Sequence, residues 1–208
     1  MTGQIGGSRE ATLSGSREAI LGRVRGALTE RDRLPHPGAS PGRPVFEGHE
    51  EVLAAFAQKF SAAGGEVIRF GSVTEAQAWA GGVYGEMKDV VQSPETPPAL
   101  RAEVAEVRPD LARLGVSLAL AAAADTGSVV LSSREGRRLQ LLPRVLLVWV
   151  DPSTVFARLE EALDSVRDQD RSALAVHSGP SKSADIGRVV VTGVHGPGRI
   201  IAGIVDLG

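Results

Sequence analysis

The stretch VSLALAAAA, residues 116–124, decides the fold of this 208-residue chain. It is a continuous apolar run with turn residues at its ends, which is typical of a strand buried on both faces. VLLVWV at 145–150 and RIIAGIVDL at 199–207 are similar apolar segments that predict further strands. Strands of this kind belong to sheets that helices cover on both sides.

Helical patterns alternate with these strands. Residues 49–65 predict an amphipathic helix that glycines end, and residues 73–82 predict another. A third helix is expected over 151–166, with Asp151 as its cap and Pro152 at its first position. The alternation predicts an α/β fold with an open mixed, mainly parallel sheet and flanking helices.

Shorter strands are expected between these elements. They are EVIRF (66–70), MKDVVQS (87–93), GSVVLSS (127–133), SALAVHS (172–178) and RVVVTG (188–193). The polar turn REGRR, residues 134–138, predicts a hairpin between the strand at 127–133 and the strand at 145–150, so the sheet is expected to be mixed. The segment 99–115 predicts short helical turns broken by Pro109.

Residues 1–48 differ in composition from the rest. One helix is expected after Ser16, followed by a proline-rich tether, so residues 1–48 are predicted to be a flexible arm and residues 49–208 the α/β domain. There is no apolar run long enough to span a bilayer and no secretory signal, so a cytoplasmic location is expected. The net charge of −2 argues against nucleic acid as a partner.

The chain contains no cysteine. That excludes disulfides, thiolate nucleophiles and thiolate ligands for an iron–sulfur cluster. Any redox chemistry would have to use a borrowed cofactor or a partner protein, and no cofactor of its own is expected in this chain. A metal site from His177, Asp185 and His195 is possible by composition, but their spacing matches no known ligand pattern, so no metal is predicted.

Three loops mix glycine with small polar residues: residues 122–131, 177–187 and 193–199. Because ligands of open α/β sheets bind beyond the carboxyl ends of the strands, we expect the loops to meet there. Hydroxyls, free backbone amides and Lys182 suit a small anion. The predicted substrate-binding residues are Thr126, Gly127, Ser128, Gly179, Ser181, Lys182, Ser183, Asp185 and Gly196. Ordinary turns, a solvated lysine and structural histidines are the alternatives.

Four segments in order carry a resemblance to a known family: ADTGSVVL (124–131), LLP (141–143), SGPSKSADI (178–186) and GVHGP (193–197). Together they resemble the LUD domain family and, within it, the lactate-utilisation protein C (LutC) group. The likeness is strong over residues 100–208.

This resemblance implies a fold like the NagB/RpiA/CoA-transferase group and a role in oxidising L-lactate to pyruvate with iron–sulfur partner proteins. In that role, Asp125 and His195 are expected to be catalytic and the loops to hold a carboxylate or phosphate. Two alternatives stay open. One is a stand-alone enzyme of the CoA-transferase or sugar-phosphate-isomerase type that uses Asp125 as nucleophile or base. The other is a non-catalytic sensor with the same pocket.

Overall fold

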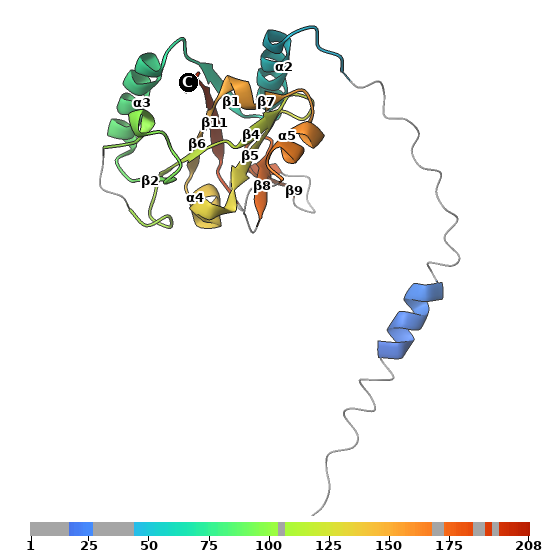
Figure 1. Ribbon diagram of the computed structural model, residues 1–208. Coiled ribbons are helices and arrows are strands. Elements are labelled where there is room, and N and C mark those ends of the chain that lie inside the picture. Colours follow the sequence, from blue (N-terminus) through green and yellow to red (C-terminus); the bar gives the residue numbers. More distant parts are fainter. Residues whose placement is uncertain (1–16, 27–43, 104–106, 168–172, 185–189, 193–195) are drawn as a thin grey trace, which may run out of the picture. The chain divides into compact units, whose positions relative to one another are not determined.

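A computed structural model describes residues 17–26, 44–103, 107–167, 173–184, 190–192 and 196–208 (Figure 1). The chain divides into two units, Met1–Arg43 and Pro44–Gly208. In the first unit, residues 17–26 are helical. In the described ranges, no helix combines the length and apolar character that crossing a bilayer requires.

A five-stranded sheet forms the centre of the second unit, and all of its strands are parallel. In spatial order the strands are β1 (Glu66–Arg69), β11 (Arg199–Ile204), β6 (Val145–Val150), β3 (Leu114–Leu118) and β2 (Val90–Gln92). This confirms the predicted α/β fold with a mainly parallel sheet.

The apolar strands are buried because structure covers both faces of this sheet (Figure 1). Helix α3 (Val73–Met87) packs with the core that contains Leu147 and Trp149 of β6. Helix α2 (His49–Ala62) packs with the core that contains Leu146 and Val148. Alternate residues of one strand thus enter different cores, which explains why β6 is apolar throughout.

A second sheet lies on the α2 side. Its strands, in spatial order, are β7 (Val155–Phe156), β4 (Ala121–Ala123), β5 (Ser128–Ser132) and β8 (Leu174–His177). Strand β5 is antiparallel to β4 and β8, and β4 is parallel to β7. Helix α5 (Leu159–Ser165) covers this sheet through Ala162, which packs with Ala121, Ala123 and Val130.

The remaining elements are short. They are η1 (Pro98–Leu100), η2 (Ser133–Glu135), α4 (Arg137–Leu141), η3 (Pro152–Thr154), and the antiparallel strands β9 (Lys182–Ala184) and β10 (Val190–Thr192).

Two strand predictions were wrong. The run 116–124 is not one strand, because the chain changes sheets at its middle. The amide of Ala119 still donates to Trp149 O of the parallel sheet, and the amide of Leu120 donates to Val130 O of the second sheet. The predicted hairpin is absent for the same reason: β5 and β6 belong to different sheets, joined through η2 and α4.

The predicted start of the helix at Asp151 was also wrong. Its carboxylate accepts the amide of Ser153 and begins the short η3 turn. The chain then forms β7, and α5 begins only at Leu159. A proline-containing start fits a 3-10 turn as well as an α-helix, so the local pattern did not separate the two.

Candidate functional site

The end of helix α2 is a platform on which two of the predicted loops rest. Gly127 has a φ of +59°, and a Cβ placed on it would lie 2.4 Å from the backbone nitrogen of Phe60. Gly179 has a φ of +106°, and a Cβ there would lie 2.9 Å from Ala63 O. Only glycine permits both the backbone conformation and the close approach at these positions. We call residues 125–128, 178–182 and 196–197, with the α2 end at 59–65, the loop cluster.

Three hydroxyls connect two of these loops. Ser128 Oγ donates to Thr126 Oγ1 at 2.8 Å and lies 2.6 Å from Ser178 Oγ. Ser128 is buried, whereas Thr126 and Ser178 are exposed. The three hydroxyls therefore extend from the protein interior to the surface, and each has hydrogen-bonding capacity beyond the contacts named.

Lys182 brings a positive charge to the same place. Its ammonium group donates to Ala63 O at the carboxyl end of α2. A cation at a helix C-terminus is stabilised by the free carbonyls and the helix dipole. An ammonium group has three donors, so this contact leaves capacity for an anion at the exposed side chain.

The third loop joins the cluster through Ser181. The Ser181 amide donates to Pro197 O at 3.0 Å, and a Cβ on Gly196 would lie 3.2 Å from Ser181 Cβ. Ser183 belongs to β9, where its backbone pairs with Val191. The predicted residues Asp185 and His195 lie outside the described residues.

Asp125 has a clear structural contact. Its Oδ1 accepts the amide of Leu159 at 3.0 Å, at the start of α5, and its own amide donates to Ala157 O. The carboxylate therefore satisfies one of the free amides of the first helical turn. A catalytic role of Asp125 stays a prediction.

His177 is a residue that the site prediction did not include. It is the last residue of β8, opposite Val129 of β5, and it precedes Ser178. Burial lowers the pKa of His177 below its ordinary value. Within the described part of the chain, its buried Nε2 has no hydrogen-bond partner. Because side chains alternate along a strand, the imidazole shares a face of the second sheet with Val129, whereas Ser128 shares the other face with Val130. The sequence signal for His177 was its place directly before SGPS.

The loop cluster is at the opposite end of the parallel sheet from the one expected. The α2 end leads into the first residue of β1, and the amides of Gly198 and Arg199 donate to Arg144 O just before β6. The cluster therefore lies at the amino ends of these strands. The prediction that the loops lie at the carboxyl ends of the strands was wrong, because residues 125–128 and 178–182 follow strands of the second sheet. The direction of those strands relative to the parallel sheet could not be predicted from the sequence.

A cavity of about 360 Å³ does lie at the carboxyl ends of β1, β6 and β11. It is lined in part by His49, Arg69, Asp151 and Asp206. Its charged groups are largely engaged, because Asp151 accepts the amides of Ser153 and Leu207 and Arg69 pairs with Glu50.

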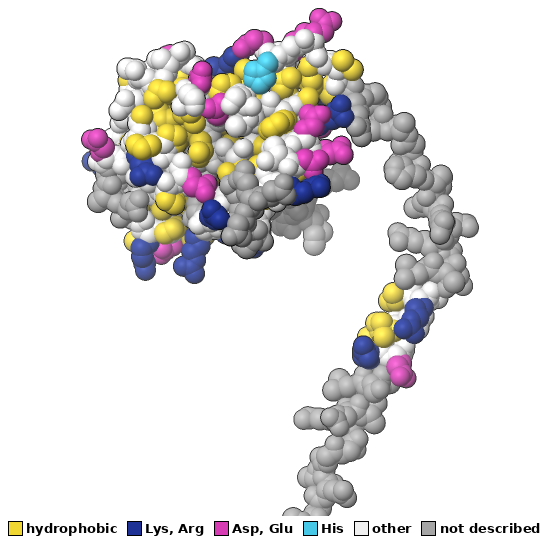
Figure 2. Space-filling view, viewed as in Figure 1, with side chains coloured by type: hydrophobic (Ala, Val, Ile, Leu, Met, Phe, Trp, Pro, Cys, Tyr) yellow, Lys and Arg dark blue, Asp and Glu magenta, His cyan; other side chains and the backbone are white. Residues whose placement is uncertain are grey.

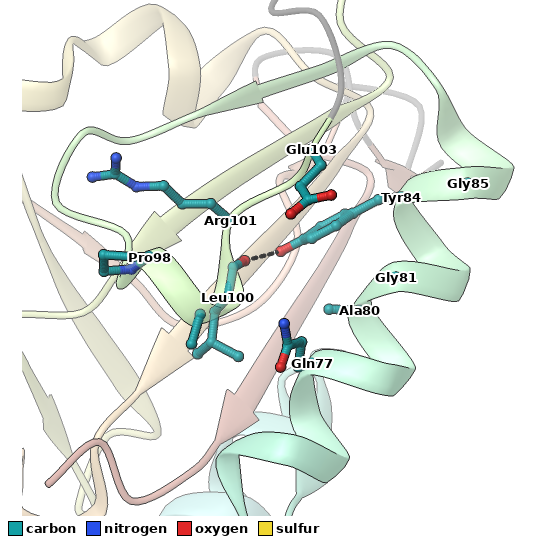
Figure 3. Close-up of a pocket in the computed structure, with 10 residues that line it drawn as sticks. Gln77, Ala80, Gly81, Tyr84, Gly85, Pro98, Leu100, Arg101 and Glu103 are labelled. Atoms are coloured by element: carbon teal, nitrogen blue, oxygen red, sulfur yellow. Dashed lines mark hydrogen bonds between the residues drawn. The ribbon is translucent and has the colours of Figure 1, made fainter.

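Another cavity, of about 330 Å³, lies between α3 and η1 (Figure 3). The hydroxyl of Tyr84 donates to Leu100 O at 2.6 Å, and burial raises the pKa of Tyr84 to about 12. The guanidinium group of Arg101 donates to the carbonyls of Pro94 and Thr96. These polar groups stabilise the turn that follows β2, so this cavity is not our candidate site.

No metal centre is apparent: across the described residues, no group of three or more His, Cys, Asp and Glu side chains is arranged to hold an ion.

Comparison with known proteins gives the family context. The sequence-family model of the LUD domain matches residues 87–205. Lactate utilization protein C of Bacillus pumilus is 38% identical over 91 residues, which are 40% of this chain and 38% of that protein. The protein of that name from Bacillus subtilis is 36% identical over 94 residues, 41% of this chain and 39% of that protein. These matches span less than half of the relatives' length.

A solved structure has a similar fold. The crystal structure of a DUF162 family protein from Deinococcus radiodurans matches with a TM-score of 0.61 and 19% identity. The structural match covers 78% of this chain and 100% of the Deinococcus radiodurans chain. At this identity, the likeness supports the fold alone.

Proposed function

Because this chain belongs to the LUD domain family, we propose that it takes part in lactate utilisation. In this proposal it is a subunit that binds a small carboxylate while L-lactate is oxidised to pyruvate. The names of its relatives support the pathway, and the loop cluster supports the ligand class.

The observation that carries the proposal is that the loop of Ser178 and the side chain of Lys182 reach the same point at the end of α2. Gly179, which follows Ser178, and the ammonium group of Lys182 both approach Ala63 O. Hydroxyl and ammonium donors at one surface site suit a carboxylate, which accepts hydrogen bonds on both oxygens. L-lactate and pyruvate each present that group beside a second oxygen.

The chemistry also requires an electron acceptor. Conversion of L-lactate to pyruvate releases two electrons and two protons. Without cysteine, this chain has no thiolates to hold an iron–sulfur cluster of its own. The proposed acceptors are the iron–sulfur partner proteins that the resemblance to lactate-utilisation protein C implies. The predicted His195, which directly precedes Gly196 of the loop cluster, is the proposed acceptor for the hydroxyl proton.

The contact of Asp125 favours this subunit over a stand-alone CoA-transferase-like enzyme. Such an enzyme would use Asp125 as its nucleophile or base. One oxygen of this carboxylate already accepts the Leu159 amide, which lowers its availability for attack.

Reconstitution tests the proposal. The full chain is combined with purified iron–sulfur lactate-utilisation proteins, and L-lactate-dependent reduction of a dye is followed. We expect turnover to require this chain and to fall at least tenfold in Lys182→Met. The matched variant Lys88→Met, at another exposed lysine, should keep the wild-type rate. Equal lactate oxidation with and without this chain would refute the proposal.

A further inference from the structure

Exposed leucines gather on either side of a cavity at the amino ends of β3 and β6. Leu111, Leu141 and Leu142 are 61%, 41% and 49% exposed. The cavity has a volume of about 550 Å³, and its lining includes Leu111 and Leu142. Contiguous exposed apolar side chains around a cavity are typical of surfaces that bind another macromolecule.

Arginines surround these leucines. Arg113 and Arg144 line the cavity, and Arg138 lies one turn before Leu142, whose amide donates to Arg138 O. We call Leu111, Leu141, Leu142, Arg113, Arg138 and Arg144 the α4 surface. Figure 2 shows dark-blue side chains along the lower rim of the domain, in the region where Figure 1 places α4.

The charges of this surface are only partly balanced. Arg113 lies 3.5 Å from Asp89, and Asp110 pairs with Arg108. No ion pair of Arg138 or Arg144 is found within the described ranges. The α4 surface is therefore positive in a chain whose net charge is −2.

From this combination we infer that the α4 surface docks a protein that presents acidic side chains around an apolar anchor. The anchor occupies the cavity between Leu111 and Leu142, and the acidic groups meet Arg138 and Arg144. Interfaces commonly combine a desolvated apolar centre with arginines at the contact. Complementary charge adds association rate and selectivity for the partner.

The position of the surface indicates which partner it serves. A Cβ on Gly196 would lie 3.8 Å from Leu141 Cδ2, so the α4 surface is continuous with the loop cluster. A protein docked there lies beside the proposed carboxylate site. The inference therefore rests on the proposed function, and the partner is an electron-accepting iron–sulfur protein with an acidic contact face.

A second copy of this chain is a poor occupant. A symmetric dimer through this surface would place the same arginines opposite one another or nearby, and like charges disfavour the contact. A partner with an acidic contact face would be attracted by these arginines.

Binding of the purified iron–sulfur proteins to the immobilised full chain tests the inference. We expect wild-type binding that weakens between 50 and 200 mM salt. Arg144→Glu and Leu142→Asp should each weaken binding at least tenfold. Arg167→Glu and Val45→Asp, exposed positions elsewhere, are the matched controls and should stay within twofold of wild type. Thermal unfolding of every variant establishes that it is folded.

Hydrogen exchange on the wild-type complex provides a readout without substitutions. Protection of residues 107–113 and 137–145 on binding supports the inference. The inference is overturned if the complex forms but leaves both segments unprotected, or if the α4 variants bind as tightly as the wild type. Neither result would contradict the proposed function. A dimer of this chain that Leu142→Asp dissociates would also overturn it. Wild-type protein that binds neither the iron–sulfur proteins nor lactate would refute the proposed function itself.

Discussion

The hydroxyl of Ser128 lies 2.6 Å from the hydroxyl of Ser178, although the two residues are fifty positions apart in the sequence. Ser128 begins β5 and Ser178 follows β8, just beyond the pair Val129 and His177 of the antiparallel ladder. This hydrogen bond therefore closes one end of the second sheet and joins two loops of the proposed site.

Removal of either hydroxyl should cost stability. Ser128→Ala removes two hydrogen bonds and should lower the free energy of unfolding by about 1–2 kcal/mol, and Ser178→Ala by about 0.5–1.5 kcal/mol. The double variant should lose less than the sum, because both changes remove the same contact. Urea unfolding of the four proteins measures the coupling, and strict additivity would show that the contact contributes nothing.

Gly127→Ala should be much more harmful than Gly136→Ala. Both glycines have positive φ, but a Cβ on Gly127 would meet the backbone of α2, whereas a Cβ on Gly136 meets nothing within 4 Å. The conformational cost alone is about 1–2 kcal/mol. The collision should add about 1–3 kcal/mol at Gly127. Equal denaturation midpoints for the two variants would contradict the packing of this loop on α2.

Stability should fall as the pH is lowered below 7, and His177 should contribute to the loss. Burial lowers the pKa of His177 in the folded chain below the ordinary value of 6.5. Between these two pKa values the unfolded chain binds a proton that the folded chain does not, so acid favours unfolding. The slope from one such group is at most about 1.4 kcal/mol per pH unit.

His177→Leu should remove this part of the pH dependence, as measured by urea unfolding between pH 7.5 and 5. His49→Leu, at an exposed histidine, is the control and should keep the wild-type slope. An unchanged slope in His177→Leu would mean that this imidazole is not buried in its neutral form.

Substitutions of Asp125 separate its structural contact from a catalytic role. Asp125→Asn keeps an oxygen that can accept the Leu159 amide, so stability should change little. Asp125→Ala leaves this amide without its partner and should cost about 1 kcal/mol. If Asp125→Asn is stable and also keeps lactate-dependent turnover in the reconstituted system, the predicted catalytic role is refuted.

The sequence predicted the parallel sheet because its strands are buried on both faces and are continuously apolar. It did not predict that residues 116–124 serve two sheets. Ala121 and Ala123 face α5 while Ala122 and Ala124 enter the core beneath, and an all-alanine segment has no alternation to reveal this. Which sheet each half of this segment joins depends on its partner strands, and these are distant in the sequence.

The site could be predicted only in part. The glycine-containing loops were identified from composition and order, and the structure brings residues 125–128, 178–182 and 196–197 together. The contacts of Asp125 with α5 and of Lys182 with α2 could not be predicted, because each joins segments that only the tertiary fold makes adjacent. The buried Nε2 of His177 likewise depends on its position in β8.

Calorimetric titration of the full chain with L-lactate and with pyruvate tests the central claim most directly. We predict saturable binding of at least one of them by the wild type, and at least tenfold weaker binding by Ser178→Ala and by Lys182→Met, with Lys88→Met unchanged. If the folded wild-type chain binds both carboxylates and the Ser178 and Lys182 variants bind as tightly, the loop cluster is not the site. Absence of any binding by the wild type would contradict the claim that this chain holds the carboxylate.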